Sequence, residues 1–509
     1  MTMDVLATTT IGKVRGFEHG GVVRFEGVPY AAPPVGALRF RPAQPHPGWS
    51  DVRDCTVAGP ICPQGPSPIT AFLGGPPQRS DEDCLFVNVI TPALDDARRP
   101  VMVWIHGGGF VMGAGTEALY DGASFVRRGG VVFVSLNYRL GELGWLDLTT
   151  LDEAEAGSGN AGLSDQIEAL RWVRDNIAVF GGDPDNVTIF GESAGAMSVG
   201  TLLASPAARG LFHRAIAQSG AASMVLPPDA AAQACREVMR SVGASDIEGL
   251  REAPVEQLVA ARAGLMARMF SGFDGADGAP SGAWLPFGPV VDGHLLPAAP
   301  LDLIADASHP RVPLLVGTNA EEWKLFMLMD PATLDDAALE ERARRVAGDA
   351  GPQIIEAYRD RLGGVSPNDL FGALAGDFIF HVPAARLADA WRSGPCAGSV
   401  HQYLFSYRST SMGGLLGACH ALEIPFVFDA LGAPGIEMFV GPGAPGDLAT
   451  AMQDAWLAFA RSGDPGHDGI PPWPALGEAT EAQVMGFDTE ISLMVEPVAE
   501  RIHLWDGLV

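Results

Sequence analysis

The sequence predicts an α/β fold in which a central, mostly parallel sheet is flanked by helices. Two short apolar runs, 101–105 and 131–136, have the length and composition of strands that are buried on both faces. The segment 164–180 follows them and carries an apolar stripe at helical spacing. Strands that alternate with helices in this way form parallel sheets with a helical layer on each face.

Further segments extend this pattern toward both ends of the chain. Residues 8–14 and 22–25 predict two antiparallel strands that are separated by Gly20 and Gly21. The Pro- and Gly-rich stretch 55–84 has no periodicity and predicts a long surface loop. Later strands are expected at 187–190, 213–218, 312–316 and 402–405, and later helices at 196–203, 228–270, 331–392 and 448–462.

The pentapeptide Gly191–Gly195 reads G-E-S-A-G and joins a predicted strand to a predicted helix. The order strand, G-x-S-x-G and helix is typical of a nucleophile elbow. Its glycines let the chain turn so sharply that a serine hydroxyl stands exposed. The following helix directs N–H groups toward developing negative charge. We therefore expect Ser193 to be a nucleophile, provided that the chain supplies a base, an acid and oxyanion donors.

A run of three glycines is the candidate for those donors. His106, Gly107, Gly108 and Gly109 directly follow a predicted buried strand. Glycines let the backbone approach a ligand closely with its N–H groups exposed. We expect Gly108 and Gly109 to donate together with Ala194, the residue after the nucleophile. His106 precedes the donors and is expected to be a hydrogen-bonded structural residue.

An acid and a base are expected after later strands, because the order along such a sheet is nucleophile, acid, histidine. Glu322 lies just past the strand predicted at 312–316, and its neighbour Glu321 is an open alternative on physical grounds. His420 ends a Gly-rich loop that follows the strand at 402–405 and fits the base best. Five histidines lie beyond Glu322: His381, His401, His420, His467 and His503.

Composition narrows the possible partners. The 509 residues carry a formal net charge of −28, which argues against nucleic acid and against an anionic membrane surface. The N-terminus lacks the pattern of a signal peptide, and no apolar run reaches the roughly 18 residues that span a bilayer, so we expect a cytoplasmic protein. The six cysteines fit no zinc pattern, and we expect no metal or cofactor.

Several motifs together resemble one family, the type-B carboxylesterases, which includes bacterial p-nitrobenzyl esterases, mammalian carboxylesterases and cholinesterases. The resemblance covers nearly the whole chain. Its motifs are FEGVPYA at 25–31, EDCL at 82–85, HGGGF at 106–110, NYRLG at 137–141, NAGLSDQ at 160–166, FGGDP at 180–184, QSG at 218–220, PVVDG at 289–293 and SGDP at 462–465.

The resemblance implies a single α/β-hydrolase domain over 1–509, with helical insertions at 228–283 and 321–400 that form a lid or gorge. It favours Glu322 over Glu321 as the acid and places His420 above the other histidines. The implied catalytic residues are Ser193, Glu322 and His420, and the implied oxyanion donors are Gly108, Gly109 and Ala194.

The resemblance also implies a substrate pocket and a hydroxyl near the triad, from Ser219. The segment 283–287 would line the acyl side, where Leu285 leaves room for more than an acetyl group. Secreted relatives link the cysteines that match Cys62 and Cys84, whereas without a signal peptide we expect thiols. The implied pocket residues are Gly107, Phe110, Glu192, Leu285 and Phe287.

The expected activity is hydrolysis of short- to medium-chain or aryl carboxylic esters through an acyl-enzyme. Amides or carbamates are an alternative with the same residues, because the leaving group is recognised by loop shape. A non-catalytic interaction module is a further alternative, disfavoured because the serine, acid and histidine are all present. We expect a small-molecule substrate and a monomer or small homo-oligomer.

Overall fold

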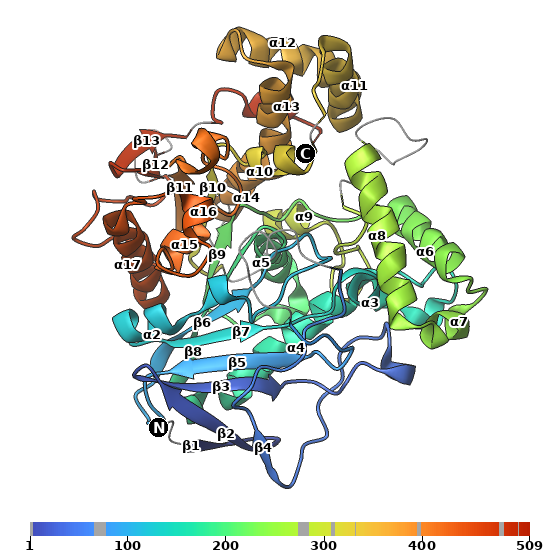
Figure 1. Cartoon of the computed structure of the whole chain (residues 1–509), viewed down its shortest axis with the longest axis vertical. Coiled ribbons are helices and arrows are strands. Elements are labelled where there is room, and N and C mark those ends of the chain that lie inside the picture. Colours follow the sequence, from blue (N-terminus) through green and yellow to red (C-terminus); the bar gives the residue numbers. More distant parts are fainter. Residues whose placement is uncertain are drawn as a thin grey trace.

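A twisted sheet runs through the middle of the protein in a computed structural model (Figure 1). The structure describes residues 4–65, 78–272, 285–306, 311–330, 332–393, 399–477, 483–496 and 498–508. Within these residues the sheet has 13 strands in the order β1-β2-β3-β5-β7-β6-β8-β9-β10-β11-β12-β13, with β4 paired to β2. The pairs from β7 to β12 are parallel, so the centre of the sheet has the predicted arrangement.

Antiparallel strand pairs flank the parallel centre at both edges of the sheet. The bounds of the strands are β1 (Asp4–Thr9), β2 (Gly12–His19), β3 (Val22–Pro29), β4 (Val52–Asp54), β5 (Phe86–Thr91), β6 (Arg99–Ile105), β7 (Val132–Leu136), β8 (Gly182–Glu192), β9 (Arg214–Gln218), β10 (Leu314–Asn319), β11 (Val400–Phe405), β12 (Gln483–Phe487) and β13 (Ser492–Val495).

Alternate residues of strand β6 enter two separate cores, which shows that both faces are covered. Val101, Val103 and Ile105 pack with helices α4 (Ala161–Asn176) and α5 (Ala194–Ala204). Met102 and Trp104 instead pack with α2 (Ala123–Gly129) and α17 (Gly446–Ser462). Successive side chains of a strand point to opposite faces, so an unbroken apolar run is what a strand between two helical layers requires.

Two groups of helices leave the sheet and return to it. The first group, at the right of Figure 1, is α6 (Pro228–Val242), α7 (Ile247–Glu252) and α8 (Val255–Gly272). The second group is α10 (Lys324–Met329), α11 (Asp336–Ala347), α12 (Gly351–Leu362), α13 (Pro367–Gly376), a π-helical turn (Asp377–His381) and α14 (Val382–Arg392). Short helices elsewhere are α3 (Gly141–Trp145), α9 (Pro300–Ala305), α15 (Ile424–Val427) and α16 (Glu437–Val440).

One helical stretch of the second group, Pro367–Arg392, is long and apolar enough to cross a membrane by length and composition. However, 78% of its most apolar window is buried inside the protein, and core helices of soluble proteins pass the same test. The stretch is therefore weak evidence for a membrane span.

Two expectations for the N-terminal region are wrong. Residues 8–14 do not form one strand, because the chain reverses between Thr9 and Gly12 at the turn that joins β1 to β2. Nor do all described parts of the stretch 55–84 lie on the surface: Cys55, Cys62 and Cys84 are buried and join the hydrophobic core. Residues 66–77 of this stretch lie outside the described residues, and its Pro- and Gly-rich composition could not show which described residues join the core.

Candidate active site

Ser193 stands between β8 and α5 in a strained backbone conformation, with φ 57° and ψ −125°. Its N–H donates to the carbonyl of Gln218 at 2.9 Å, and its own carbonyl accepts from Met197 at 2.9 Å. The flanking glycines are required by space: a Cβ on Gly191 would lie 2.6 Å from the Ile105 carbonyl oxygen, and one on Gly195 only 2.0 Å. The sharp turn is therefore fixed from both sides of the serine.

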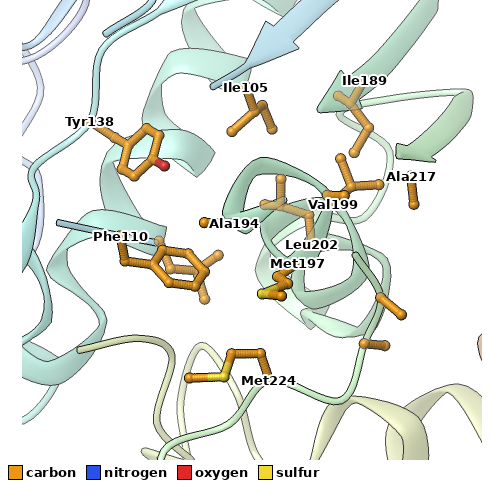
Figure 2. Close-up of a cluster of buried hydrophobic side chains, with 14 of the residues drawn as sticks. Ile105, Phe110, Tyr138, Ile189, Ala194, Met197, Val199, Leu202, Ala217 and Met224 are labelled. Atoms are coloured by element: carbon orange, nitrogen blue, oxygen red, sulfur yellow. The ribbon is translucent and has the colours of Figure 1, made fainter. Parts of the chain in front are cut away.

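Helix α5 is buried along its whole length, and apolar side chains surround it (Figure 2). Ile105 and Ile189 come from the neighbouring strands, while Phe110, Tyr138 and Met224 approach from loops. Because this packing fixes the helix, its first N–H groups stay aimed at the position of the serine.

The segment Gly107–Gly113, called the glycine loop below, passes directly beside Ser193. A Cβ on Gly107 would lie 3.1 Å from the Ser193 Cβ. Gly108 and Gly109 have φ of 102° and 62°, and Phe110 also has a positive φ of 61°. The loop is tight, because the Gly108 carbonyl accepts the N–H groups of both the third and the fourth residue after it, each at 3.1 Å.

His106 is held in place by contacts with Gly107 and Tyr138, as expected for a structural residue. Its Nδ1 lies 2.9 Å from the Gly107 carbonyl oxygen, and its ring stacks on Tyr138 with centroids 4.4 Å apart. Complete burial lowers the pKa of His106 to about 4, against a smaller opposing effect of that carbonyl contact. The ring is therefore uncharged at neutral pH.

The structure brings Glu322, and not Glu321, to His420. Glu322 Oε2 lies 2.7 Å from His420 Nδ1, and its Oε1 accepts the N–H of Asn319 at 2.8 Å. Glu321 turns to the outer side, where it pairs with Lys324 at 2.9 Å and with Arg408. A carboxylate on Nδ1 leaves Nε2 as the ring nitrogen that can take a proton from a nucleophile.

The second ring nitrogen of His420 faces another carboxyl group. His420 Nε2 lies 3.1 Å from Glu192 Oε1, and both residues are buried. Within the described residues, no hydrogen bond joins Ser193 Oγ to His420. Hydrogen bonds between a catalytic base and its nucleophile are often long or misaligned without substrate. Ser193 directly follows Glu192 in the sequence.

Burial and charge act on this pair in opposite directions. Burial opposes a charge on His420, but the carboxylates of Glu192 and Glu322 outweigh it and raise the pKa of His420 to about 9. Burial raises the pKa of Glu192 to about 8, although His420 opposes this shift. A histidine and a carboxyl group with displaced pKa values, beside an elbow serine, are typical of an acid–base site.

A third buried carboxyl group, that of Glu423, supports the acid–base side. Glu423 accepts from Gln218 Nε2 at 3.1 Å and from Asn319 Nδ2 at 2.6 Å. Gln218 also accepts the indole N–H of Trp456 at 2.9 Å. The network ties the loop of His420 to the strands β9 and β10. Sequence reasoning assigned no role to these partners, although Gln218 lies in the QSG motif, because nothing in their spacing distinguishes them from other polar residues.

Ser219 follows Gln218 with a positive φ of 51° and is completely buried. Its N–H donates to the Gly317 carbonyl at 2.8 Å, whereas its hydroxyl has no hydrogen-bond partner among the described residues.

Leu285, one of the expected pocket residues, lies beside the glycine loop: its Cδ2 would be 3.4 Å from a Cβ on Gly109. Phe110 and Phe287 are fully buried, and the ring of Phe110 packs edge-to-face on Trp145 with centroids 4.8 Å apart. Residues 283 and 284 of the predicted acyl-side segment lie outside the described residues.

Cys62 and Cys84 are free, buried thiols in this structure. Cys62 Sγ accepts the N–H of Leu140 at 3.3 Å, and a hydrogen bond with Cys62 together with burial raises the pKa of the Cys84 thiol. No group of three or more His, Cys, Asp or Glu residues in the described part of the chain is arranged to hold a metal ion.

Comparisons with known proteins agree over almost the full length. Residues 3–505 match the Carboxylesterase family. The chain is 38% identical to phenmedipham hydrolase of Pseudarthrobacter oxydans and 37% identical to para-nitrobenzyl esterase of Bacillus subtilis, with 98% and 97% of both sequences covered, respectively. The crystal structure of Geobacillus stearothermophilus carboxylesterase EST55 matches with a TM-score of 0.87 at 36% identity, over 98% of this chain and 99% of that one.

Proposed function

The chain belongs to the carboxylesterase family and hydrolyses carboxylic esters of small molecules, and from this premise we propose which of its residues do the chemistry. Ser193 is the nucleophile, His420 the general base and Glu322 the acid that orients it. Gly108, Gly109 and Ala194 donate to the oxyanion. This assignment rests on the 2.7 Å contact of His420 with Glu322. His420 also contacts Glu192, the residue before Ser193.

The reaction proceeds in two acyl transfers. His420 Nε2 takes the proton of Ser193 as Oγ attacks the ester carbonyl, and the carbonyl electron pair moves onto oxygen. The three N–H groups stabilise this oxyanion. Collapse of the intermediate releases the alcohol, which leaves with the proton from His420. Water then repeats the sequence on the acyl-enzyme and frees the acid.

We infer that short- to medium-chain and aryl esters are the preferred substrates. Leu285, beside Gly109, is smaller than an aromatic ring and leaves space next to the oxyanion donors. Phe287 would close the same side of the pocket and Gly107 would border the serine. Glu192 and Phe110 complete the proposed lining.

Carbamates are a second candidate class, because a relative with 38% identity hydrolyses phenmedipham. The same serine, histidine and oxyanion donors would serve either carbonyl. A panel of para-nitrobenzyl and p-nitrophenyl esters of increasing acyl length, run beside phenmedipham, ranks the classes by kcat/KM. Equal or higher values for phenmedipham would make the carbamate the better assignment.

The serine assignment is tested by labelling and mutation. A radiolabelled organophosphate should modify one residue per chain, found by peptide mass analysis at Ser193, and Ser193→Ala should lose p-nitrophenyl butyrate hydrolysis by roughly 10⁵–10⁶. Ser198→Ala, on the next turn of α5, is the matched control and should keep its activity. Labelling elsewhere, or an active Ser193→Ala, would overturn the proposal.

We further propose a cytoplasmic protein that binds neither nucleic acid nor membrane and works as a monomer or small homo-oligomer. The net charge of −28 supports the first part, because anionic polymers and anionic bilayers would be repelled. Light scattering of the purified protein, with and without anionic vesicles, measures both the oligomer and the membrane contact.

A further inference from the structure

A buried ion pair connects the helices α8 and α3 beside the glycine loop. Arg262 on α8 and Glu142 on α3 are joined by two hydrogen bonds of 2.9 and 2.7 Å. Their side chains are only 4% and 0% exposed. A buried pair of this kind is weak evidence for stability, because desolvation of the two charges offsets their attraction. Stability alone therefore does not explain why this ion pair is buried here.

The same guanidinium group also holds the glycine loop. Arg262 Nη1 donates to the Val111 carbonyl at 2.8 Å. The preceding carbonyl, that of Phe110, accepts the N–H of Gly141 at 2.7 Å. Two consecutive carbonyls are thus fixed from outside the loop, directly after the glycines that carry the proposed oxyanion donors. Since the carbonyl and the next N–H belong to one rigid peptide plane, fixing these carbonyls restricts the orientation of the whole loop.

The glycine at position 141 leaves the space that the guanidinium group of Arg262 occupies. Gly141 has φ 53°, and a Cβ there would lie 2.1 Å from Arg262 Nε. Any other residue at 141 would displace the guanidinium or the turn. Glu142, the next residue, binds the far side of the same group and so fixes the direction in which it points.

We propose that Arg262 is a positioning residue for the reaction, which holds the glycine loop in its oxyanion-binding geometry through the Val111 carbonyl while Glu142 holds the guanidinium. The inference rests on the oxyanion donors assigned under the proposed function. It makes helix α8, in the first helical insertion, a part of the support for the transition state. Oxyanion stabilisation depends on donors placed in advance, so a small displacement of the loop reduces the rate.

The test replaces both charges together. Arg262→Met/Glu142→Leu removes the anchor without leaving one buried charge unpaired. We expect kcat for p-nitrophenyl butyrate to fall by roughly 10–100-fold per organophosphate-titrated site, with KM unchanged within about threefold. Inhibition by an alkyl trifluoromethyl ketone should weaken by the same factor as kcat/KM. In that complex Ser193 Oγ bonds to the ketone carbon, the carbonyl electron pair becomes an oxyanion and the serine proton passes to His420.

A matched control is available in the pair Arg39–Glu82. Arg39 binds Glu82 and the backbone carbonyls of Arg251 and Ala253, each at 2.7 Å, so it also ties the first insertion to the core. Unlike Arg262 it has no contact with the glycine loop among the described residues. Arg39→Met/Glu82→Leu should lower the melting temperature at least as much and leave kcat and ketone inhibition unchanged.

The outcomes separate the possibilities. If the Arg262/Glu142 variant loses stability but keeps kcat and ketone affinity, the pair is only structural and the inference is wrong. If it does not fold, Arg262→Lys takes its place: lysine keeps the charge but cannot span Glu142 and Val111, and the same kcat-specific loss is expected. If the ketone does not inhibit the wild-type protein, the proposed oxyanion site itself fails, and this inference falls with it.

Discussion

The two halves of the active site are positioned differently: the half with the nucleophile and the oxyanion donors by the backbone, and the acid–base half by side chains. Ser193 and the glycine loop are positioned mainly by main-chain hydrogen bonds and by glycines that have no room for a Cβ, with the side chain of Arg262 added at the Val111 carbonyl. Glu322 and His420 are positioned by carboxylate and amide contacts through Asn319 and Glu423. The first half is therefore sensitive mainly to added volume, and the second to lost charge.

This difference also separates the two halves along the chain. The backbone half comes from adjacent strands of the parallel centre, β6 and β8, which lie within about 90 residues of sequence. The acid–base half comes from loops after β10 and β11, with helices α10 to α14 inserted between them. The two halves can therefore be tested separately, by removing charge from one and adding volume to the other.

Loss of charge in the acid–base half should have the largest effect. Glu322→Gln removes the carboxylate that orients His420 and stabilises its charged form, and we expect kcat to fall by roughly 10³–10⁴. The neighbour supplies the control: Glu321 binds Lys324, Arg408 and the N–H of Ala418, and a glutamine there keeps an oxygen that can accept from Ala418, so Glu321→Gln should keep its activity. Steady-state kinetics on both variants would reverse the assignment if Glu321→Gln lost more.

Added volume should damage the backbone half almost as much. Gly108 has φ 102°, and a Cβ there would lie 2.1 Å from the Met112 carbonyl oxygen, so Gly108→Ala must open the glycine loop. We expect kcat to fall by roughly 10²–10³, the effect of losing one oxyanion donor. Gly109→Ala should lose less, because the nearest atom would be Leu285 Cδ2 at 3.4 Å.

The control for strain alone is Gly130, the cap of α2. It has φ 60°, and no atom of the described residues would lie within 4 Å of a Cβ there, so Gly130→Ala costs about 1 kcal/mol of backbone strain without a clash. Thermal unfolding and kcat measured side by side distinguish the two effects. A Gly130→Ala variant that lost as much activity as Gly108→Ala would show that general strain, and not loop geometry, explains the loss.

The backbone half was the more predictable from sequence, and for a physical reason. Glycines that a fold requires are visible as letters, as at Gly191, Gly195 and Gly107–Gly109, and a strand buried on both faces is visible as an apolar run, as at 101–105. The parallel α/β architecture follows from the same runs, and the comparisons confirm it.

The acid–base half needed the resemblance or the structure. Glu321 and Glu322 both follow β10, and what separates them is the turn in which the Glu321 N–H donates to the Ala418 carbonyl, a contact nearly 100 residues away in sequence. Single polar residues such as Glu423 and Arg262 carry no periodic signal. Long-range contacts of this kind depend on the completed fold, which also explains the unexpected burial of Cys62.

The smallest change in rate, but a distinct one, is expected where the two halves meet. Glu192 precedes the nucleophile and lies 3.1 Å from His420 Nε2, and after the opposing effect of burial it contributes most to raising the pKa of His420 to about 9. His420 must be uncharged to act as a base, so kcat/KM of the wild type should rise with pH until about 9. Glu192→Gln removes the negative charge, lowers the pKa of His420 and should move this acid limb to lower pH, with less than about a tenfold change in the limiting kcat.

Glu496→Gln is the control, because burial raises the pKa of Glu496 to about 7 at a position beside Arg501. If the acid limb stayed in place in Glu192→Gln, or moved equally in Glu496→Gln, Glu192 would not be the group that sets the proton affinity of the base.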